Sequence, residues 1–352
     1  MISHIFFFVL GLVFLVKGSD FFIESSSRIA KKMGVSDFLI GLTLTSVGTS
    51  IPELASSVSA ASQGHTGLII GNVVGSNIAN VGLIIGVSAI LKSYKTTKRM
   101  YERDGYIMIF SAILFFVFSL DNVITKIEGI MLLIMYGFYI LFLLKSDDNK
   151  IKKYKFHDFM NYVFGFEYIT SVKTRLIHTA INKNPGERTI NENRLVGMFK
   201  EGLVKDILII VISGVAIIYG AKYMVSESVW IASLLGLPES VIGLSIIAVG
   251  TSLPELIVSF NAVKKGLGNL IIGNVIGSNI ANIALVVGIA SLISPIQVTE
   301  MNVITTIPIM IFFSLGLLHL IRSNWKIDKK KGIMILFAYF VFMFTAFFMG
   351  WS

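Results

Sequence analysis

Two acidic residues in this chain lie within long apolar stretches, each inside a copy of the same short peptide. Glu53 belongs to Gly-Thr-Ser-Ile-Pro-Glu-Leu (residues 48–54), and Glu255 belongs to Gly-Thr-Ser-Leu-Pro-Glu-Leu (residues 250–256). An ionisable group inside an apolar span is costly in lipid, and it therefore usually marks a functional site. The two carboxylates predict a place where cations are bound.

Polar side chains accompany each acid at helical spacing, so each copy should present one polar stripe on an apolar helix. The first stripe is Ser46, Thr49, Ser50, Glu53 and Ser57, and the second is Ser245, Ala248, Thr251, Ser252, Glu255 and Ser259. In each copy a proline (Pro52, Pro254) leaves the carbonyl four residues earlier without its usual donor. We therefore expect each helix to bend or unwind there.

A second duplicated peptide follows each acid. Residues 71–80 read Gly-Asn-Val-Val-Gly-Ser-Asn-Ile-Ala-Asn, and residues 273–282 read Gly-Asn-Val-Ile-Gly-Ser-Asn-Ile-Ala-Asn. Three polar residues of each copy share one helical face; they are Asn72, Ser76 and Asn80, and Asn274, Ser278 and Asn282. The four segments together offer carboxylates, hydroxyls, amide oxygens and loosened carbonyls, without His or Cys. Such an all-oxygen set favours hard cations such as Ca²⁺ or Na⁺ over zinc or copper.

Charge balance predicts how such a site would work. Two unpaired carboxylates at the middle of a bilayer cost several kcal/mol each. One Ca²⁺ neutralises both, and so do two Na⁺ or two protons. The occupancies should therefore exclude one another, and an empty site should be too costly to reorient. Mutual exclusion combined with alternating access is antiport.

Structural explanations exist for the same residues. The acids could pair with Lys17 and Lys222, which lie inside apolar spans. The Asn and Ser side chains could simply hydrogen-bond to neighbouring helices, and the spacing of Gly71 and Gly75 is typical of close helix packing. The duplication of the acid within a polar stripe favours a binding site.

The elements that must position these residues are themselves duplicated. Residues 34–86 and 236–288 align without a gap at an offset of 202, with 28 identities in 53 positions. Such self-similarity indicates an internal repeat. The chain has 352 residues, of which 54% are hydrophobic and 14% charged, which is typical of a polytopic membrane protein. Zero Cys excludes disulfides and thiolate metal sites.

The apolar pattern predicts an all-α membrane protein with ten transmembrane helices. The expected spans are 3–25, 37–61, 67–91, 105–120, 123–144, 206–229, 238–262, 269–293, 301–321 and 332–350. Five fall in a first repeat (1–144) and five in a second (205–352). Because five is odd, the second repeat should cross the membrane in the opposite direction, which makes the pair an inverted-topology repeat.

The net charge of +9 has a topological explanation that requires no nucleic acid. Under the ten-span prediction, 27 of the 30 Lys and Arg residues fall in alternate loops. Positively charged loops remain on the cytoplasmic side, so both termini should lie outside. The segment 145–204 is then a basic cytoplasmic linker. Phe156, Phe159, Met160 and Val163 have the spacing of an amphipathic helix within it. The linker could be a plain connection or have a regulatory role.

The paired Gly-Thr-Ser-x-Pro-Glu and Gly-Asn-Val-x-Gly-Ser-Asn-Ile-Ala-Asn segments resemble the two alpha repeats of the sodium/calcium exchanger family, in particular its prokaryotic members. That family belongs to the calcium:cation antiporter superfamily. The resemblance implies ten helices. The second, third, seventh and eighth of them would build the ion sites, while the first and sixth move across them to switch access.

The resemblance also implies roles for individual residues. The carboxylate ligands for both ions would be Glu53 and Glu255, and carbonyl ligands for Ca²⁺ would come from Thr49 and Thr251. The serine hydroxyls for Na⁺ would be those of Ser50, Ser252, Ser76 and Ser278. Two further backbone carbonyls would come from Ser46 and Ala248, and the central site would be lined by Asn80 and Asn282. A backbone role would explain why the side chain differs between Ser46 and Ala248.

Two comparisons within the superfamily bear on the counter-ion. Potassium-dependent exchangers carry Asp where this chain has Asn282, which argues against potassium co-transport. Proton/calcium exchangers have Gly-Asn-x-x-Glu in place of Gly-Thr-Ser-x-Pro-Glu, which favours sodium over the proton.

We therefore expect a secondary antiporter that exchanges Na⁺ for Ca²⁺ across the cytoplasmic membrane and extrudes Ca²⁺. The alternatives are a proton/calcium antiporter on the same scaffold and, less well matched to Pro-broken inverted repeats, a cation channel. We expect no enzyme activity, because the spans lack a nucleophile–base pair, an HExxH motif and a phosphate loop. Beyond Ca²⁺, Na⁺ and the lipid bilayer, we expect no cofactor and no obligate protein partner.

Overall fold

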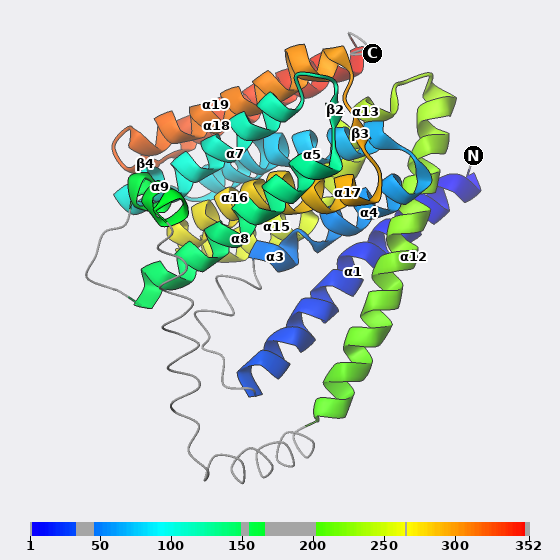
Figure 1. Ribbon diagram of the computed structural model, residues 1–352, viewed down its shortest axis with the longest axis horizontal. Helices are drawn as coiled ribbons and strands as arrows, with labels where there is room; N and C mark the ends of the chain where they lie inside the picture. The colour runs from blue at the N-terminus through cyan, green and yellow to red at the C-terminus, as the bar shows by residue number, and fades with distance from the viewer. Residues whose placement is uncertain (1, 33–45, 149–154, 166–201, 265, 349–352) are drawn as a thin grey trace.

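The computed structural model describes residues 2–32, 46–148, 155–165, 202–264 and 266–348. Within them the chain is almost entirely helical (Figure 1). Three sequence predictions fall partly outside the described residues. They are the start of the span 37–61, the end of the span 332–350, and most of the linker 145–204.

The first half of the chain contains a long helix, an interrupted one and several continuous spans. Its elements are α1 (Ile2–Lys32), α3 (Ser46–Thr49), α4 (Ile51–Gln63), α5 (Thr66–Ala79), η2 (Asn80–Ile85), α6 (Gly86–Leu91), β1 (Tyr94–Lys95), η3 (Met100–Gly105), α7 (Tyr106–Phe118), β2 (Val123–Ile124) and α8 (Lys126–Asp148). The η elements are π-helical turns that continue the neighbouring α-helices. A short helix, α9 (Phe156–Phe164), follows and packs against α8 and η3.

The second half repeats this order. Its elements are α12 (Leu203–Leu235), α13 (Glu239–Ile242), η4 (Gly243–Ile247), α14 (Ala248–Thr251), α15 (Leu253–Lys264), α16 (Gly268–Ala281), η5 (Asn282–Val287), α17 (Gly288–Ile293), β3 (Ile296–Gln297), η6 (Asn302–Thr306), α18 (Ile307–Arg322), β4 (Lys326–Ile327) and α19 (Lys329–Phe348). The bounds of α14, α16, η5 and α17 equal those of α3, α5, η2 and α6 plus 202.

The two halves are joined by two short antiparallel ribbons. Strand β1 pairs with β4, and β2 pairs with β3. Each ribbon therefore takes one strand from each half. These pairings fix the loops after α6 and α17 against the loops of the opposite half.

Seven helices in the described part of the chain are long and apolar enough to cross a membrane, or eight if the bent pair Glu239–Thr251 and Leu253–Lys264 is one span. The described chain is therefore that of a multi-pass membrane protein. The expected count of ten stays a prediction for two reasons. The helix 46–63 begins next to residues outside the described part, and Glu102, Arg103 and Asp104 interrupt the apolar stretch at the start of η3–α7.

The helices that follow the two acids lie at the centre of the bundle. The segments Thr66–Leu91 and Gly268–Ile293 are 83% and 78% buried in the protein, whereas α1 and α12 are about one-third buried or less (33% and 28%). Apolar residues that are buried on all sides of a helix indicate contact with protein rather than lipid. The bundle core is therefore built around α5 and α16.

Helices α1 and α12 form a pair at the edge of the bundle and run at an angle to it (Figure 1). Their backbones touch: a Cβ added at Gly11 would lie 2.9 Å from the Gly220 carbonyl oxygen. They are joined toward both ends, by an ion pair between Arg28 Nε and Asp206 Oδ1 (2.7 Å) and by a hydrogen bond between His4 Nδ1 and Glu227 Oε2 (2.7 Å). Close backbone contact and these two links hold α1 and α12 together as one unit.

Candidate ion-binding site

The helix that carries each acid is interrupted next to the proline, as the sequence predicts. In the second half α14 ends at Thr251 and α15 begins at Leu253, with a bend of 44° between the two segments. Ser252 lies at the break with φ −80° and ψ 6°, and Ser50 takes nearly the same conformation (φ −86°, ψ 6°). Pro52 and Pro254 have no N–H to donate to the carbonyl four residues earlier, and in the interior such a carbonyl needs another polar neighbour.

Both acids are fully buried between the two halves. Glu53 and Glu255 each have 0% of their surface exposed. The Ser252 hydroxyl donates to Glu53 Oε1 (3.2 Å), and the Ser278 hydroxyl donates to Glu255 Oε1 (3.3 Å). The second oxygen of each carboxylate has no hydrogen-bond partner among the described residues. A buried carboxylate oxygen without a donor is costly, so this arrangement favours a bound cation or proton.

Hydroxyl groups connect the halves in a symmetric pattern. Thr49 Oγ1 lies 3.3 Å from Ser278 Oγ, and Ser76 Oγ lies 3.4 Å from Thr251 Oγ1. The two contacts are equivalent in the repeat, because Thr251 is the counterpart of Thr49 and Ser278 is the counterpart of Ser76 at the offset of 202. The oxygen atoms around the carboxylates therefore come from both halves.

One backbone carbonyl also reaches this cluster. The Ala248 carbonyl oxygen accepts from Thr251 Oγ1 (3.3 Å) and lies 3.5 Å from Ser76 Oγ. This is the position at which the family resemblance implies a carbonyl ligand rather than a side chain. For its counterpart Ser46 the structure describes the backbone, which opens α3, but not the side chain.

The remaining predicted residues lie in the same interior. Ser50 and Ser252 are buried at the helix breaks (1% and 3% exposed). Asn80 and Asn282 begin the π-helical turns η2 and η5, and both are fully buried. Asn80 Nδ2 donates to Asn279 Oδ1 (3.0 Å), while Asn80 Oδ1 and both amide atoms of Asn282 have no partner among the described residues. These amides can accept or donate further contacts.

Asn72 has a role that the sequence analysis left open between packing and binding. Its Nδ2 donates to the hydroxyls of Ser56 and Ser57 (3.0 Å each) and to the Glu53 carbonyl (3.3 Å), while its Oδ1 accepts from Thr251 Oγ1 (3.2 Å). Asn72 therefore connects the backbone of Glu53 to Thr251, which lies next to the helix break of the other half. In the sequence, the signal for this role is that Asn72 shares a polar helical face with Ser76.

The lysines considered as partners do not reach the acids. Lys17 Nζ lies 3.4 Å from Asp20 Oδ2 on the same helix, and Lys222 is exposed whereas Glu255 is fully buried. Asp20, Glu24 and Lys17 instead belong to local charge pairs on α1, which include Arg28 with Glu24 at 2.8 Å. Within the described residues, the two carboxylates have no cationic side chain as a partner.

Known proteins resemble this chain over nearly its whole length. The family model described as sodium/calcium exchanger protein matches residues 3–145 and 205–348. The chain is 46% identical to the sodium/calcium exchanger MaX1 of Methanosarcina acetivorans, over 97% of both chains. It is 32% identical to the membrane protein MJ0091 of Methanocaldococcus jannaschii, over 95% of both. A structure of the sodium-calcium exchanger NCX_Mj, soaked with 2.5 mM Na⁺ and 10 mM Sr²⁺, is 29% identical and superposes with a TM-score of 0.60 over 98% of both chains.

Proposed function

Because this chain belongs to the sodium/calcium exchanger family, we propose that it exchanges Na⁺ for Ca²⁺ across the cytoplasmic membrane. The observation that carries the proposal is the pair of fully buried carboxylates, Glu53 and Glu255, each with one oxygen lacking a donor among the described residues. They lie among hydroxyl and carbonyl oxygens from both repeats. This is a donor set for hard cations.

The proposed ligands divide by the ion they serve. Glu53 and Glu255 bind Ca²⁺ or Na⁺, because one Ca²⁺ or two Na⁺ cancel their charge. Two threonine carbonyls complete the Ca²⁺ shell, and two further positions offer backbone carbonyls. Four serine hydroxyls serve Na⁺, and two asparagines line the central site. These further ligands are Thr49 and Thr251; Ser46 and Ala248; Ser50, Ser252, Ser76 and Ser278; and Asn80 and Asn282.

Alternating access follows from an inverted repeat. We propose ten transmembrane helices in two five-helix repeats, residues 1–144 and 205–352, connected by the cytoplasmic linker 145–204. The constant offset of 202 between matching elements supports this arrangement, and so do the ribbons that join the halves. The α1–α12 pair, with its own internal links, is the element that would move across the site.

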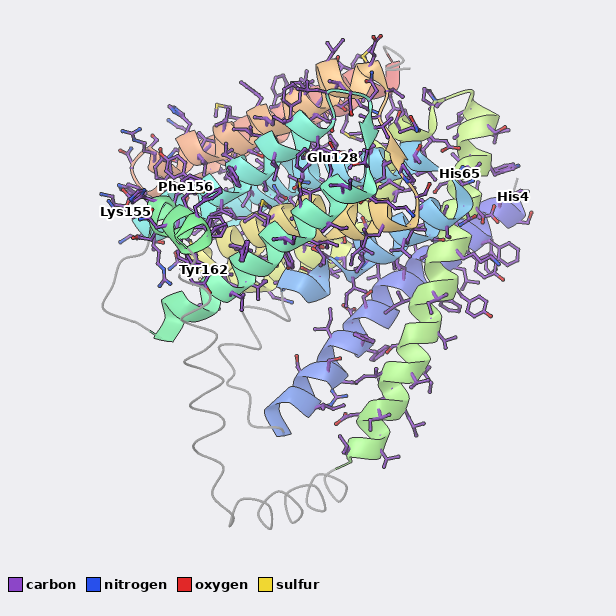
Figure 2. The ribbon with its side chains drawn as sticks, viewed as in Figure 1. His4, His65, Glu128, Lys155, Phe156 and Tyr162 are labelled. Carbon is purple, nitrogen blue, oxygen red and sulfur yellow. The ribbon has the colours of Figure 1, made fainter. Side chains whose placement is uncertain are left out.

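The distribution of charge supports an orientation. Lys155 lies at one end of the bundle, and His4 and His65 lie at the other (Figure 2). The basic segments that end α6 and α18 are predicted to share the end that holds Lys155. By the positive-inside rule we assign that end to the cytoplasm, with both termini outside. Extrusion of Ca²⁺ would use the inward Na⁺ gradient and move net charge if more than two Na⁺ exchange for each Ca²⁺.

The test is uptake of ⁴⁵Ca²⁺ into proteoliposomes that are loaded with Na⁺ and diluted into Na⁺-free buffer. We expect uptake that requires internal Na⁺ and is lost in Glu53→Gln and Glu255→Gln. Glu300→Gln serves as the matched control, because Glu300 is exposed and the substitution is identical. Uptake driven by a pH jump without Na⁺ would assign the protein to proton/calcium antiport. Flux without saturation or counter-ion would indicate a channel.

A further inference from the structure

The two repeats differ in how the asparagine beside each acid is bonded. In the first repeat Asn72 makes four hydrogen bonds, three to oxygens of α4 and one with Thr251. Its counterpart in the second repeat, at the offset of 202, is Asn274, which is buried (3% exposed). Neither side-chain atom of Asn274 has a hydrogen-bond partner among the described residues, and the same is true of Ser259 Oγ, the counterpart of Ser57 Oγ. The second repeat therefore leaves open a polar corner that the first repeat fills.

One sequence difference between the repeats explains the open corner. In the first repeat Ser56 Oγ donates to the Glu53 carbonyl (3.0 Å) and accepts from Asn72 Nδ2 (3.0 Å). The counterpart of Ser56 is Val258, which has no hydroxyl group. Asn274 therefore lacks the partner that joins Asn72 to the backbone of its acid.

The unpartnered atoms gather one helical turn beyond Glu255. Ser259 follows Glu255 by four residues and lies on the same face of α15, and α16, which contains Asn274, packs against α15. Three acceptor oxygens in this corner lack a donor from any described residue; they are Glu255 Oε2, Ser259 Oγ and Asn274 Oδ1. Because buried polar atoms in proteins are nearly always satisfied, these oxygens indicate a bound ion or water.

The charge of the corner selects the ion. One carboxylate, from Glu255, and two neutral oxygens give a formal charge of −1. A single Na⁺ neutralises this charge, whereas Ca²⁺ would leave an excess of +1. Ca²⁺ also takes about six to eight oxygen ligands, more than this corner offers. The donor set therefore favours Na⁺.

A cavity of about 940 Å³ approaches the corner from the end of the α15–α16 hairpin. Val263 and Ile271 line it, and both are buried (6% and 1% exposed). Val263 lies one turn beyond Ser259 on α15, and Ile271 lies three residues before Asn274 on α16. The cavity therefore ends about one turn of each helix away from the unpartnered oxygens.

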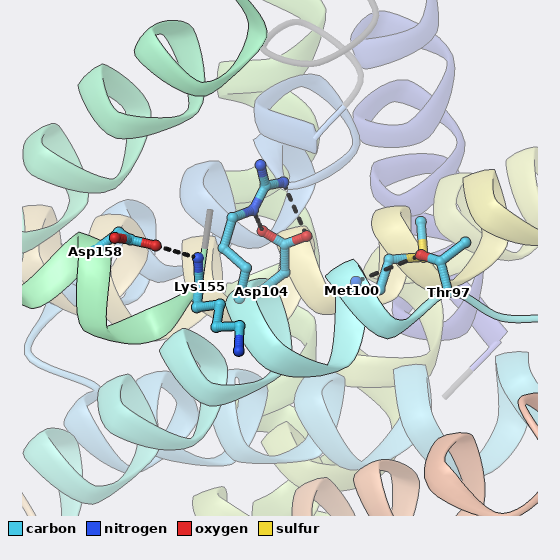
Figure 3. A network of polar contacts seen from close by, with 6 residues as sticks. Thr97, Met100, Asp104, Lys155 and Asp158 are labelled. Atoms are coloured by element: carbon cyan, nitrogen blue, oxygen red, sulfur yellow. Dashed lines mark hydrogen bonds and ion pairs between the residues drawn. The ribbon is translucent and has the colours of Figure 1, made fainter. Parts of the chain in front are cut away.

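The mouth of this cavity belongs to the basic segment that follows α6, which the proposed orientation assigns to the cytoplasm. Lys92 and Lys95 line the mouth, and both are exposed, so salt in the surrounding water screens their charge. Thr97 forms part of the wall, and its hydroxyl accepts from the Met100 N–H (3.4 Å) at the start of η3 (Figure 3). The corresponding end of α4 lies beside His65, at the opposite end of the bundle (Figure 2).

We propose that Glu255, Ser259 and Asn274 form a Na⁺ subsite on the cytoplasmic side of the two acids. The inference rests on the proposed Na⁺/Ca²⁺ exchange and adds to it a position that Na⁺ reaches from the cytoplasm. In the first repeat the hydrogen bonds of Asn72 occupy the equivalent position, so external Na⁺ finds no such subsite. Cytoplasmic Na⁺ bound here competes with the loading of Ca²⁺ at Glu255.

The test titrates Na⁺ in the bath against ⁴⁵Ca²⁺ uptake into Na⁺-loaded membrane vesicles. Everted vesicles turn the cytoplasmic face to the bath, and right-side-out vesicles turn the external face to it. Ser259→Ala removes one ligand, and Val258→Ser supplies a hydroxyl that would bond Asn274 as Ser56 bonds Asn72. We expect each substitution to raise the half-inhibiting Na⁺ concentration about fivefold at the cytoplasmic face and to leave it unchanged at the external face.

Val258→Ala is the matched control, because it shortens the side chain without adding a hydroxyl, and it should leave Na⁺ inhibition unchanged at both faces. Equal values for Val258→Ser and Val258→Ala, or equal shifts at the two faces, would overturn the subsite and assign the unpartnered atoms to ordered water. If Ser259→Ala raised the Ca²⁺ concentration for half-maximal uptake from a Na⁺-free bath, Ser259 would be a Ca²⁺ ligand and the proposal would be wrong. Unaltered protein without Na⁺-dependent uptake would refute the exchange itself, a result distinct from failure of the subsite alone.

Discussion

A single methyl group added at Gly71 tests how closely the two repeats are joined. A Cβ at this position would lie 2.7 Å from the Leu244 nitrogen and 2.8 Å from the Gly243 Cα. Both atoms are backbone of the other repeat, so no side chain can rotate away. The reciprocal Cβ at Gly243 would lie 3.0 Å from the Asn72 nitrogen. Helix α5 and the η4 turn therefore meet backbone to backbone.

The size of the effect follows from these distances. Carbon atoms are most stable about 3.5–4.0 Å apart, so Gly71→Ala must separate the helices by roughly 1 Å. Overpacking of a tight core usually costs about 1–3 kcal/mol, and the absence of a yielding side chain favours the upper end. The same shift would lengthen the contact of Ser76 with Thr251, now 3.4 Å, beyond hydrogen-bonding range. We expect lower stability and weaker ion binding together.

Thermal unfolding followed by tryptophan fluorescence measures the stability, because the chain has three Trp and no Cys for thiol dyes. The Ca²⁺ concentration at half-maximal exchange measures how tightly the site binds Ca²⁺. Gly137→Ala is the control: no atom lies within 4 Å of its added Cβ, and Ala favours a helix over Gly by about 1 kcal/mol. If Gly71→Ala behaves like Gly137→Ala in both measurements, the inferred backbone contact between the repeats is wrong.

Two further predictions concern the charge of the site. Lowering the pH equally on both sides should raise the Ca²⁺ concentration needed for half-maximal exchange and leave the maximal rate unchanged. The reason is that a proton would neutralise Glu53 and Glu255, the carboxylates of the proposed Ca²⁺ site. A fall in the maximal rate alone would place the titrating group elsewhere. Asn282→Asp should change the formal charge of the site from −2 to −3, so Na⁺-driven Ca²⁺ uptake should come to depend on an added monovalent cation such as K⁺. Unchanged uptake in K⁺-free buffer would contradict this reasoning.

Much of the local structure was predictable because it depends on nearby residues. The helix interruptions follow from Pro52 and Pro254, whose missing N–H groups act within one turn. The π-helical turns η2 and η5, which begin at Asn80 and Asn282, were not predicted. A π-helical turn adds one residue to a helix without changing the apolar pattern of its sequence. Tertiary contacts therefore determine where such a turn forms. The two-residue ribbons are too short to leave a periodic signal.

The site residues were predictable as a set, but their partners were not. Helical spacing places Ser252 and Glu255 on one stripe, whereas in the structure Ser252 donates to Glu53 of the other repeat at 3.2 Å. A stripe shows which side chains share a face and carries no information about which helix it meets. The bond between Asn72 and Thr251 was unpredictable for the same reason, since it crosses between the repeats.

These crossed contacts explain why the proposed transport would be an obligatory exchange. Each acid receives a hydroxyl, and the donor to Glu53 comes from the opposite repeat, so neither repeat forms the site alone. Without a cation, two buried carboxylates retain an oxygen that no described residue satisfies. Movement of α1 and α12 over such an empty site would seal unpaired charge inside the protein, at a cost of several kcal/mol. Either Ca²⁺ or Na⁺ would remove that cost, so the proposed moving pair would cross only when one of them is bound.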